Sequence, residues 1–187
     1  MLKNIEQKIL SDYYFNYSVY TYDFLRKNGN WQSAKRLVLD KGDGAAVLMI
    51  DKTKECALFV KQFRYPVYVN EKIESFLEVC AGVLEEDSPL ECVKREAIEE
   101  TGYEIFNIEK IFDSYMSPGA VTERLHLYIA EYNSSNKVAD GGGLDHETED
   151  IELEEIPLSK LPDMLKKGQI RDAKTLLLIQ AYLLSTS

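Results

Sequence analysis

Residues 88–102 restrict the fold more than any other segment, because they combine a helix with marked ends and a group of three glutamates over residues 96–100. Ser88 is a favourable N-cap, Pro89 suits the first helical position, and Glu91 has the spacing of a capping box. Gly102 suits the left-handed residue that ends many helices. The segment therefore predicts a helix that begins at Pro89 and ends before Gly102.

Three glutamates lie in the second half of this helix, and Glu99 and Glu100 follow Glu96 by three and four residues. On an α-helix this spacing places the carboxylates on one face, where they repel one another unless a cation neutralises them. Hard oxygen ligands on a rigid element favour Mg²⁺, with Mn²⁺ as the alternative ion. Arg95 is expected to hold one carboxylate by a bidentate bond. A solvated acidic surface helix is the competing interpretation, and the combination of loop, arginine and glutamates disfavours it.

The composition excludes several classes of protein. With 187 residues, 45% of them hydrophobic, the chain is long enough for one well-buried domain. A net charge of −10 argues against non-specific nucleic-acid binding. We find neither eighteen consecutive apolar residues nor a secretory signal, so we expect a soluble, cytoplasmic protein that does not bind membranes. Cys56, Cys80 and Cys92 are odd in number and lack C-x-x-C spacing, which predicts reduced thiols in or near the core.

The remaining pattern predicts a mixed sheet with helices on either side, an α+β fold. Partly alternating residues 13–26 and the Asn28-Gly29 pair predict an N-terminal β-hairpin. Further elements are strands over 31–39, 45–50, 57–64, 76–79, 108–115, 123–132 and 151–156, and helices over 158–167 and 173–185. We expect an N-terminal β extension over residues 1–40 and a second domain over residues 41–187.

The N-terminal hairpin is rich in aromatic residues, and an isolated hairpin is only marginally stable in water. Its apolar face therefore needs a partner. That partner is either the hairpin's own domain or a second copy of the chain, and residues 1–40 would then contribute to a homodimer interface.

The segment from Ala81 to Tyr103 resembles the Nudix box, G-x5-E-x7-R-E-U-x-E-E-x-G-U with U apolar, found in hydrolases of nucleoside diphosphates linked to another group. Its helical half matches at every defined position, with Tyr103 as a loose apolar match. In the loop half, Asp87 takes the place of the first glutamate. Gly82 lies one residue later than the family's glycine, so the loop is one residue short. The resemblance implies the Nudix fold, an α/β/α sandwich.

Over nearly its whole length the chain resembles the NudK-type GDP-mannose pyrophosphatase branch of this family. The shortened loop of that branch also begins Cys-Ala-Gly. The segments that carry this resemblance are Lys8–Phe15, Cys80–Gly82, Met116–Glu123, Gly141–Gly143, Glu149–Glu152 and Ile170–Thr175. The branch implies Mg²⁺-dependent hydrolysis of GDP-mannose to GMP and mannose 1-phosphate, and dimerisation through the N-terminal segment. An ADP-ribose or other sugar-nucleotide pyrophosphatase is the alternative. A catalytically silent binding module is disfavoured, because all the helix carboxylates of the box are present.

The resemblance also implies site residues. The metal ligands it implies are the Ala81 carbonyl, Glu96, Glu100 and Glu149, to which the helix pattern adds Glu99. The substrate contacts it implies are Tyr14, Lys35, Arg36, Arg64, Gly82, Glu123 and Lys174. The residues themselves leave three candidates for the carboxylate that positions or deprotonates water, namely Glu100, Glu149 and Glu123. We expect Arg95 to orient a glutamate.

The polar, glycine-containing segment from Asn133 to Thr148 offers little apolar burial to offset its ordering entropy. We therefore expect this segment to be mobile without ligand and to be ordered by substrate and Mg²⁺ together. Glu149 stands at its end, where it would approach the bound substrate.

Overall fold

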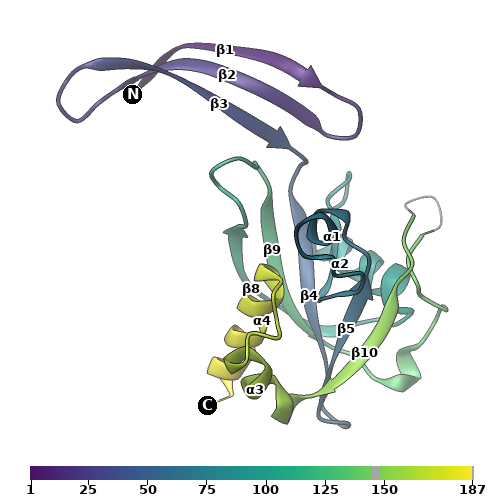
Figure 1. The fold of residues 1–187 in the computed structure, drawn as a ribbon. Coiled ribbons are helices and arrows are strands. Elements are labelled where there is room, and N and C mark those ends of the chain that lie inside the picture. Colours follow the sequence, from purple (N-terminus) through teal and green to yellow (C-terminus); the bar gives the residue numbers. More distant parts are fainter. Residues whose placement is uncertain (145–147, 187) are drawn as a thin grey trace. The chain divides into compact units, whose positions relative to one another are not determined.

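The computed structural model describes residues 1–144 and 148–186, and the chain forms two compact units (Figure 1). Unit 1 comprises residues 1–43 together with residues 115–124. Unit 2 comprises residues 44–114 and 125–187. Part of the predicted mobile segment, residues 145–147, lies outside the described residues.

Unit 1 is built on a three-stranded antiparallel sheet in the order β1-β2-β3. Its strands are β1 (Leu2–Ser11), β2 (Asn16–Leu25) and β3 (Trp31–Asp40). The predicted hairpin is confirmed, because β2 and β3 pair without interruption and their turn contains Gly29 with φ 84°. β1 was not predicted, because its apolar residues do not alternate with polar ones in the way that marks a strand.

Unit 2 is built on a mixed sheet whose main path runs β10-β5-β4-β9-β8, with β6 paired to β5 and β7 paired to β4. The strands are β4 (Gly44–Asp51), β5 (Cys56–Gln62), β6 (Phe76–Glu78), β7 (Cys80–Val83), β8 (Phe106–Tyr115), β9 (Arg124–Glu131) and β10 (Glu152–Pro157). The helices are α1 (Tyr65–Glu71), α2 (Pro89–Glu96), η1 (Ala97–Thr101), η2 (Ser134–Asn136), η4 (Leu158–Lys160), α3 (Leu161–Lys166) and α4 (Ala173–Ser185).

Strand β4 is the centre of the sheet, and all eight of its residues are buried. It runs parallel to β9, and its other edge is shared by two antiparallel partners. Residues 44–47 pair with β7, whereas residues 49–51 pair with β5. β7 therefore pairs with the first half of β4 and β5 pairs with the second half. The chain continues from β7 through a short loop into helix α2.

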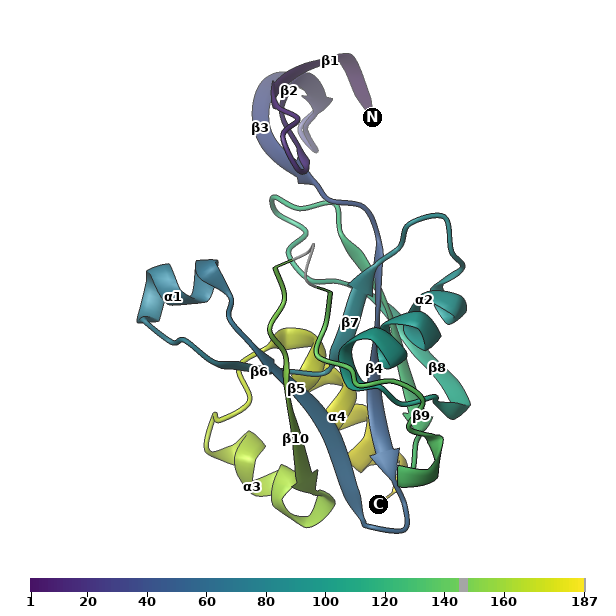
Figure 2. The ribbon, with the colours of Figure 1, turned by 90° about the vertical axis from the view of Figure 1, so that its right-hand side faces the viewer.

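The core fills both faces of β4, because side chains alternate between the faces of a strand. Ala45, Val47 and Met49 pack in one cluster with Cys92 and Val93 of α2. Helix α4 packs on the same strand, and Figure 2 shows α2 and α4 on opposite sides of it. The predicted layers of helix, mixed sheet and helix are therefore confirmed.

The predicted strands of unit 2 are confirmed with end shifts of at most two residues, and α4 has the predicted bounds. α1 and β7 were not predicted. α1 has only seven residues and no buried side chain, so it lacks an apolar periodicity. All three cysteines are free and buried, as expected. Among the described residues, no helix is long and apolar enough to cross a membrane.

Candidate active site

The acidic helix begins as its sequence predicts. The Ser88 hydroxyl accepts a hydrogen bond from the Glu91 amide at 3.3 Å, and Pro89 occupies the first turn. The capping box is only half formed, because the Glu91 carboxylate binds Lys94 at 2.8 Å instead of the Ser88 amide. The helix is α-helical to Glu96 and continues as one π-helical turn, η1, which widens the backbone where the glutamates lie.

Gly102 ends the helix in the left-handed conformation, with φ 80° and an amide bonded to the Ile98 carbonyl at 2.9 Å. A side chain at this position would also overlap the Ala139 backbone. Glycine is therefore required here both by the backbone angle and by the close approach of a second segment.

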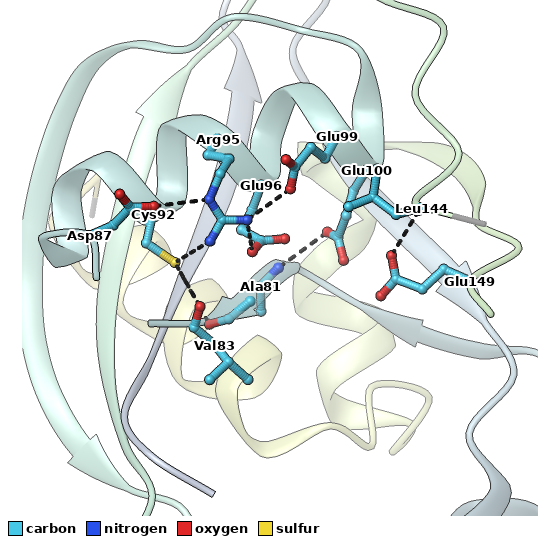
Figure 3. Close-up of polar contacts among 11 residues, drawn as sticks. Ala81, Val83, Asp87, Cys92, Arg95, Glu96, Glu99, Glu100, Leu144 and Glu149 are labelled. Atoms are coloured by element: carbon cyan, nitrogen blue, oxygen red, sulfur yellow. Dashed lines mark hydrogen bonds and ion pairs between the residues drawn. The ribbon is translucent and has the colours of Figure 1, made fainter. Parts of the chain in front are cut away.

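Arg95 lies among acidic side chains and binds three of them (Figure 3). Its Nη1 atom lies 2.8 Å from both Glu96 Oε1 and Glu99 Oε2, and its Nε atom lies 3.0 Å from Asp87 Oδ2. The predicted bidentate bond to one carboxylate is therefore wrong. Because the guanidinium presents its donors as a fork, it connects separate carboxylates and fixes the orientations of Glu96 and Glu99 relative to the loop.

Glu100 is the most buried carboxylate of the helix, with 1% of its surface exposed. Its Oε2 atom accepts a hydrogen bond from the Ala81 amide at 3.2 Å. Burial raises the pKa of Glu100 to about 8, and the charges of Glu96 and Glu149 add to the increase, while the Cys80 thiol and the Ala81 amide oppose it. Burial and the neighbouring Glu100 also raise the pKa of the Cys80 thiol well above its usual range, so this thiol stays protonated.

Glu96 lies under β7 and its carboxylate occupies the space beside Gly82. A Cβ atom added at Gly82 would overlap the Glu96 carboxylate. Burial raises the pKa of Glu96 to about 7, with Arg95 opposing the increase and Glu99 and Glu149 adding to it. The absence of a side chain at Gly82 therefore lets this carboxylate lie directly against the strand.

Glu149 reaches the same region from outside the helix. Its Oε2 atom accepts a hydrogen bond from the Leu144 amide at 3.3 Å (Figure 3). Its charge raises the pKa values of both Glu96 and Glu100, which places it within electrostatic range of these two residues. Figure 3 shows Glu149 on the same side of the helix end as Glu100, and a shared metal site of these carboxylates stays a prediction.

The segment before Glu149 is anchored more firmly than its composition predicts. The Gly142 amide binds the Glu100 carbonyl at 2.9 Å, and the Gly143 amide binds the Glu99 carbonyl at 3.1 Å. Positive φ angles at Gly141, Gly142 and Gly143 allow this path. As far as Leu144, the described backbone therefore has a defined anchor on the end of the helix, and mobility of residues 133–148 without ligand stays a prediction.

The chemistry of this cluster fits a divalent cation. Glu96, Glu100 and Glu149 supply hard oxygen atoms. Burial, together with the repulsion between these carboxylates, raises the pKa of Glu96 and Glu100, and a bound cation would offset both effects. Within residues 1–144 and 148–186, no three carboxylate, imidazole or thiol groups already have the arrangement of a metal site. The carboxylates therefore provide suitable donors, whose positions would adjust around an ion.

Two of the predicted substrate contacts, Arg64 and Lys174, are joined by a carboxylate that the sequence did not single out. Glu78 binds Arg64 through two hydrogen bonds, at 2.6 and 3.2 Å, and also binds Lys174. Lys174 also pairs with Asp172 at 3.1 Å. Glu78 escaped notice because a lone glutamate in a three-residue strand carries no recognisable spacing.

Besides Gly82 of β7, the other predicted contacts belong to unit 1, namely Tyr14, Lys35, Arg36 and Glu123. Tyr14 is 76% exposed and lies edge-on to Phe15. Lys35 and Arg36 are exposed on β3, where the Arg36 side chain bonds the Lys35 carbonyl at 2.8 Å. Glu123 forms an ion pair with Lys41 at 2.7 Å. The contacts described for these four residues all lie within unit 1, and their roles in substrate binding stay predictions.

Comparison with known proteins identifies the family. The NUDIX domain model matches residues 40–179, which is more than half of the chain. The chain belongs to the Nudix family. A second model, described as the GDP-mannose pyrophosphatase NudK N-terminal domain, matches residues 2–39 of this Nudix protein. Both parts of the resemblance seen in the sequence are therefore confirmed.

The Nudix protein is 48% identical over 177 residues to a GDP-mannose pyrophosphatase of Pectobacterium atrosepticum, a match that covers 94% of this chain and 91% of that relative. It is 47% identical over 184 residues to a GDP-mannose pyrophosphatase of Citrobacter koseri, covering 98% and 95%. A solved structure of an ADP compounds hydrolase has a TM-score of 0.75 and 15% identity, covering 97% of this chain and 91% of that chain. At this identity the likeness concerns the fold alone, and it agrees with the expected Nudix fold.

Proposed function

We propose that this Nudix protein is a Mg²⁺-dependent pyrophosphohydrolase that cleaves the diphosphate linkage of a nucleotide sugar, with GDP-mannose as the preferred substrate. The structural observation that supports the proposal is the placement of Glu96 and Glu100 beside β7, where Arg95 binds Glu96 at 2.8 Å, the Ala81 amide binds Glu100 at 3.2 Å, and burial raises the pKa of both carboxylates. The two GDP-mannose pyrophosphatases that are nearly half identical to the chain support the choice of substrate.

The proposed ligands of the cation are the Ala81 carbonyl and the carboxylates of Glu96, Glu99, Glu100 and Glu149, with Mn²⁺ as the alternative ion. A bound divalent cation supplies positive charge against the diphosphate and makes water easier to deprotonate. The protein itself orients its ligands, because Arg95 holds Glu96 and Glu99 while the Ala81 amide holds Glu100.

The proposed reaction adds one water molecule across the P–O–P bridge. One phosphorus atom gains the water oxygen and loses the bridging oxygen, which leaves with the other phosphate. GDP-mannose therefore yields GMP and mannose 1-phosphate, and the protons of water are released as the new phosphates ionise. The proposed substrate contacts are Tyr14, Lys35, Arg36, Arg64, Gly82, Glu123 and Lys174.

An assay of the purified protein tests this function. We expect Mg²⁺-dependent turnover of GDP-mannose with a higher kcat/KM than for ADP-ribose, and equal amounts of GMP and mannose 1-phosphate as products. A higher kcat/KM for ADP-ribose would replace the substrate but keep the reaction. Failure to hydrolyse any nucleotide sugar with Mg²⁺ or Mn²⁺ would reject the proposal.

A carboxylate must position or deprotonate the attacking water, and Glu100, Glu149 and Glu123 are the proposed candidates. Glu149 is favoured for a test, because it lies on a separate segment from the helix ligands. We expect Glu149→Gln to lower kcat more than it weakens the binding of GDP in Mg²⁺, measured by steady-state kinetics and calorimetry. Unchanged kcat in this variant would remove Glu149 from the set and direct the same measurement to Glu123→Gln.

We also propose that the protein is a homodimer to which residues 1–40 contribute. All ten residues of β1 are exposed, and β1 is an edge of its sheet. Leu2 and Ile5 of this strand line a groove of about 870 Å³ within unit 1. An exposed edge strand with apolar side chains favours association with another chain. Location in the cytoplasm stays a prediction, which cell fractionation would test.

A further inference from the structure

Glu78, the last residue of β6, is the centre of a buried ion cluster. Only 3% of its surface is exposed. Its Oε1 atom accepts a hydrogen bond from Arg64 Nε at 2.6 Å, and its Oε2 atom accepts bonds from Arg64 Nη2 at 3.2 Å and from Lys174 Nζ. The Glu78 carboxylate therefore binds two positively charged side chains. It binds Arg64 in a bidentate manner, through the edge of the guanidinium that carries Nε and Nη2.

This arrangement leaves the other edge of Arg64 available. The Arg64 side chain is 39% exposed, and within residues 1–144 and 148–186 its Nη1 group has no hydrogen-bond partner. Burial alone would lower the pKa of Arg64, but Glu78 outweighs it, and Glu100 and Glu149 also raise this pKa. Arg64 is therefore within electrostatic range of two carboxylates of the candidate active site.

The cluster is fixed from behind by α4. Asp172 caps this helix through the Thr175 amide at 3.0 Å and also binds Lys174 at 3.1 Å. The Thr175 hydroxyl accepts a hydrogen bond from the Val79 amide at 2.8 Å, next to Glu78 in the chain. Glu78 is thus bound to α4 through both its side chain and the adjacent backbone, which restricts its rotamer.

Stability alone does not explain such a cluster. Desolvating several charges is costly, and well-packed apolar residues often replace buried ion pairs without loss of stability. We propose that Glu78 is a positioning residue, which holds the inner edge of Arg64 so that the outer N–H groups bind the diphosphate of the substrate beside Glu100 and Glu149. Lys174 keeps Glu78 in place. This inference rests on the proposed function and assigns Glu78 a role in it.

A double-mutant cycle tests the role, with Glu78→Gln, Arg64→Ala and the double variant compared with the wild-type protein. If Glu78 acts through Arg64, Glu78→Gln should lower kcat/KM for GDP-mannose about tenfold or more. The double variant should then match Arg64→Ala within about twofold. Glu131→Gln is the control, because Glu131 at the end of β9 binds Lys52 and Asn107 and has no part in the proposed site. Its kcat/KM should stay at the wild-type value.

A purely structural role predicts a different result. The losses of the two single variants would then multiply in the double variant, and this outcome, or wild-type kcat/KM in Glu78→Gln, would overturn the proposal. If Glu78→Gln does not fold, Glu78→Asp replaces it, because it keeps the charge but shortens the reach by one methylene. The same cycle measured as the Kd of GDP with Mg²⁺ decides the role of Glu78 even if wild-type protein hydrolyses no nucleotide sugar.

Discussion

Glu100 is subject to opposite demands with and without a cation. Burial and neighbouring carboxylates raise its pKa to about 8, so the metal-free protein favours the protonated acid near neutral pH. A divalent cation binds the ionised carboxylate. Binding of Mg²⁺ at Glu100 is therefore expected to release a proton, and the affinity for Mg²⁺ should rise with pH.

Glu100→Gln keeps the shape of the side chain and removes its charge. We expect turnover to fall at least about a hundredfold, because the variant lacks the carboxylate that we propose to hold the metal or to act as the acid–base group. Steady-state kinetics at saturating Mg²⁺ measures the effect. Glu91→Gln on the same helix is the control, because Glu91 faces solvent and pairs only with Lys94 in the described structure. Near-normal turnover of Glu100→Gln would reject the assignment of Glu100.

The raised pKa of Glu100 also predicts how the stability of metal-free protein depends on pH. Between the unfolded pKa near 4.5 and the folded pKa of about 8, the folded state binds more protons than the unfolded state. The contribution of this group to stability is complete at low pH and is lost as pH rises through that window. The free energy of unfolding in EDTA should therefore fall more steeply from pH 5 to pH 8 in wild-type protein than in Glu100→Gln. Parallel profiles would contradict this expectation.

Among the elements, β7 shows how a strand can define the place of a side chain on a helix. Gly82 lies against Glu96 so closely that an added Cβ atom would displace the carboxylate. The displaced group is the flexible end of a side chain, so the fold should tolerate a small substitution there.

We expect Gly82→Ala to fold with near wild-type Tm but to bind Mg²⁺ at least about tenfold more weakly, because Glu96 would leave its position. Calorimetry of Mg²⁺ binding and thermal unfolding in EDTA measure the two quantities. Unaltered Mg²⁺ affinity in a folded variant would show that Glu96 does not need this strand.

The elements that sequence predicted have strong local signals, and those that it missed do not. The helix start at Ser88 and the stop at Gly102 follow from side-chain capping and from a backbone angle that glycine permits. β7 has only four residues and is specified by its pairing with β4, which a local pattern does not contain. The Glu78 cluster was missed for the same reason, since Glu78 and Lys174 are 96 residues apart.

For the whole molecule, the exposed side chains of β1 predict self-association. Ile5→Asp and Ile9→Asp together place charges on a strand in which both isoleucines are more than half exposed. We expect wild-type protein to behave as a dimer and this variant as a monomer in light scattering at micromolar concentration. Leu184→Asp near the end of α4, an even more exposed apolar position in unit 2, should remain dimeric. A wild-type monomer with full activity would reject the proposed dimer.

The shared edge of β4 has a consequence for how such a chain can change length during evolution. Residues 44–47 set the pairing register of β7, and residues 49–51 set that of β5. One inserted or deleted residue within β4 would therefore shift β7 relative to β5. It would also turn buried side chains of β4 to the opposite face of the sheet. The turn at residues 52–55 and the loop at residues 84–87 lie outside these pairings. Insertions and deletions among homologues should therefore accumulate in those two connections and spare residues 44–51.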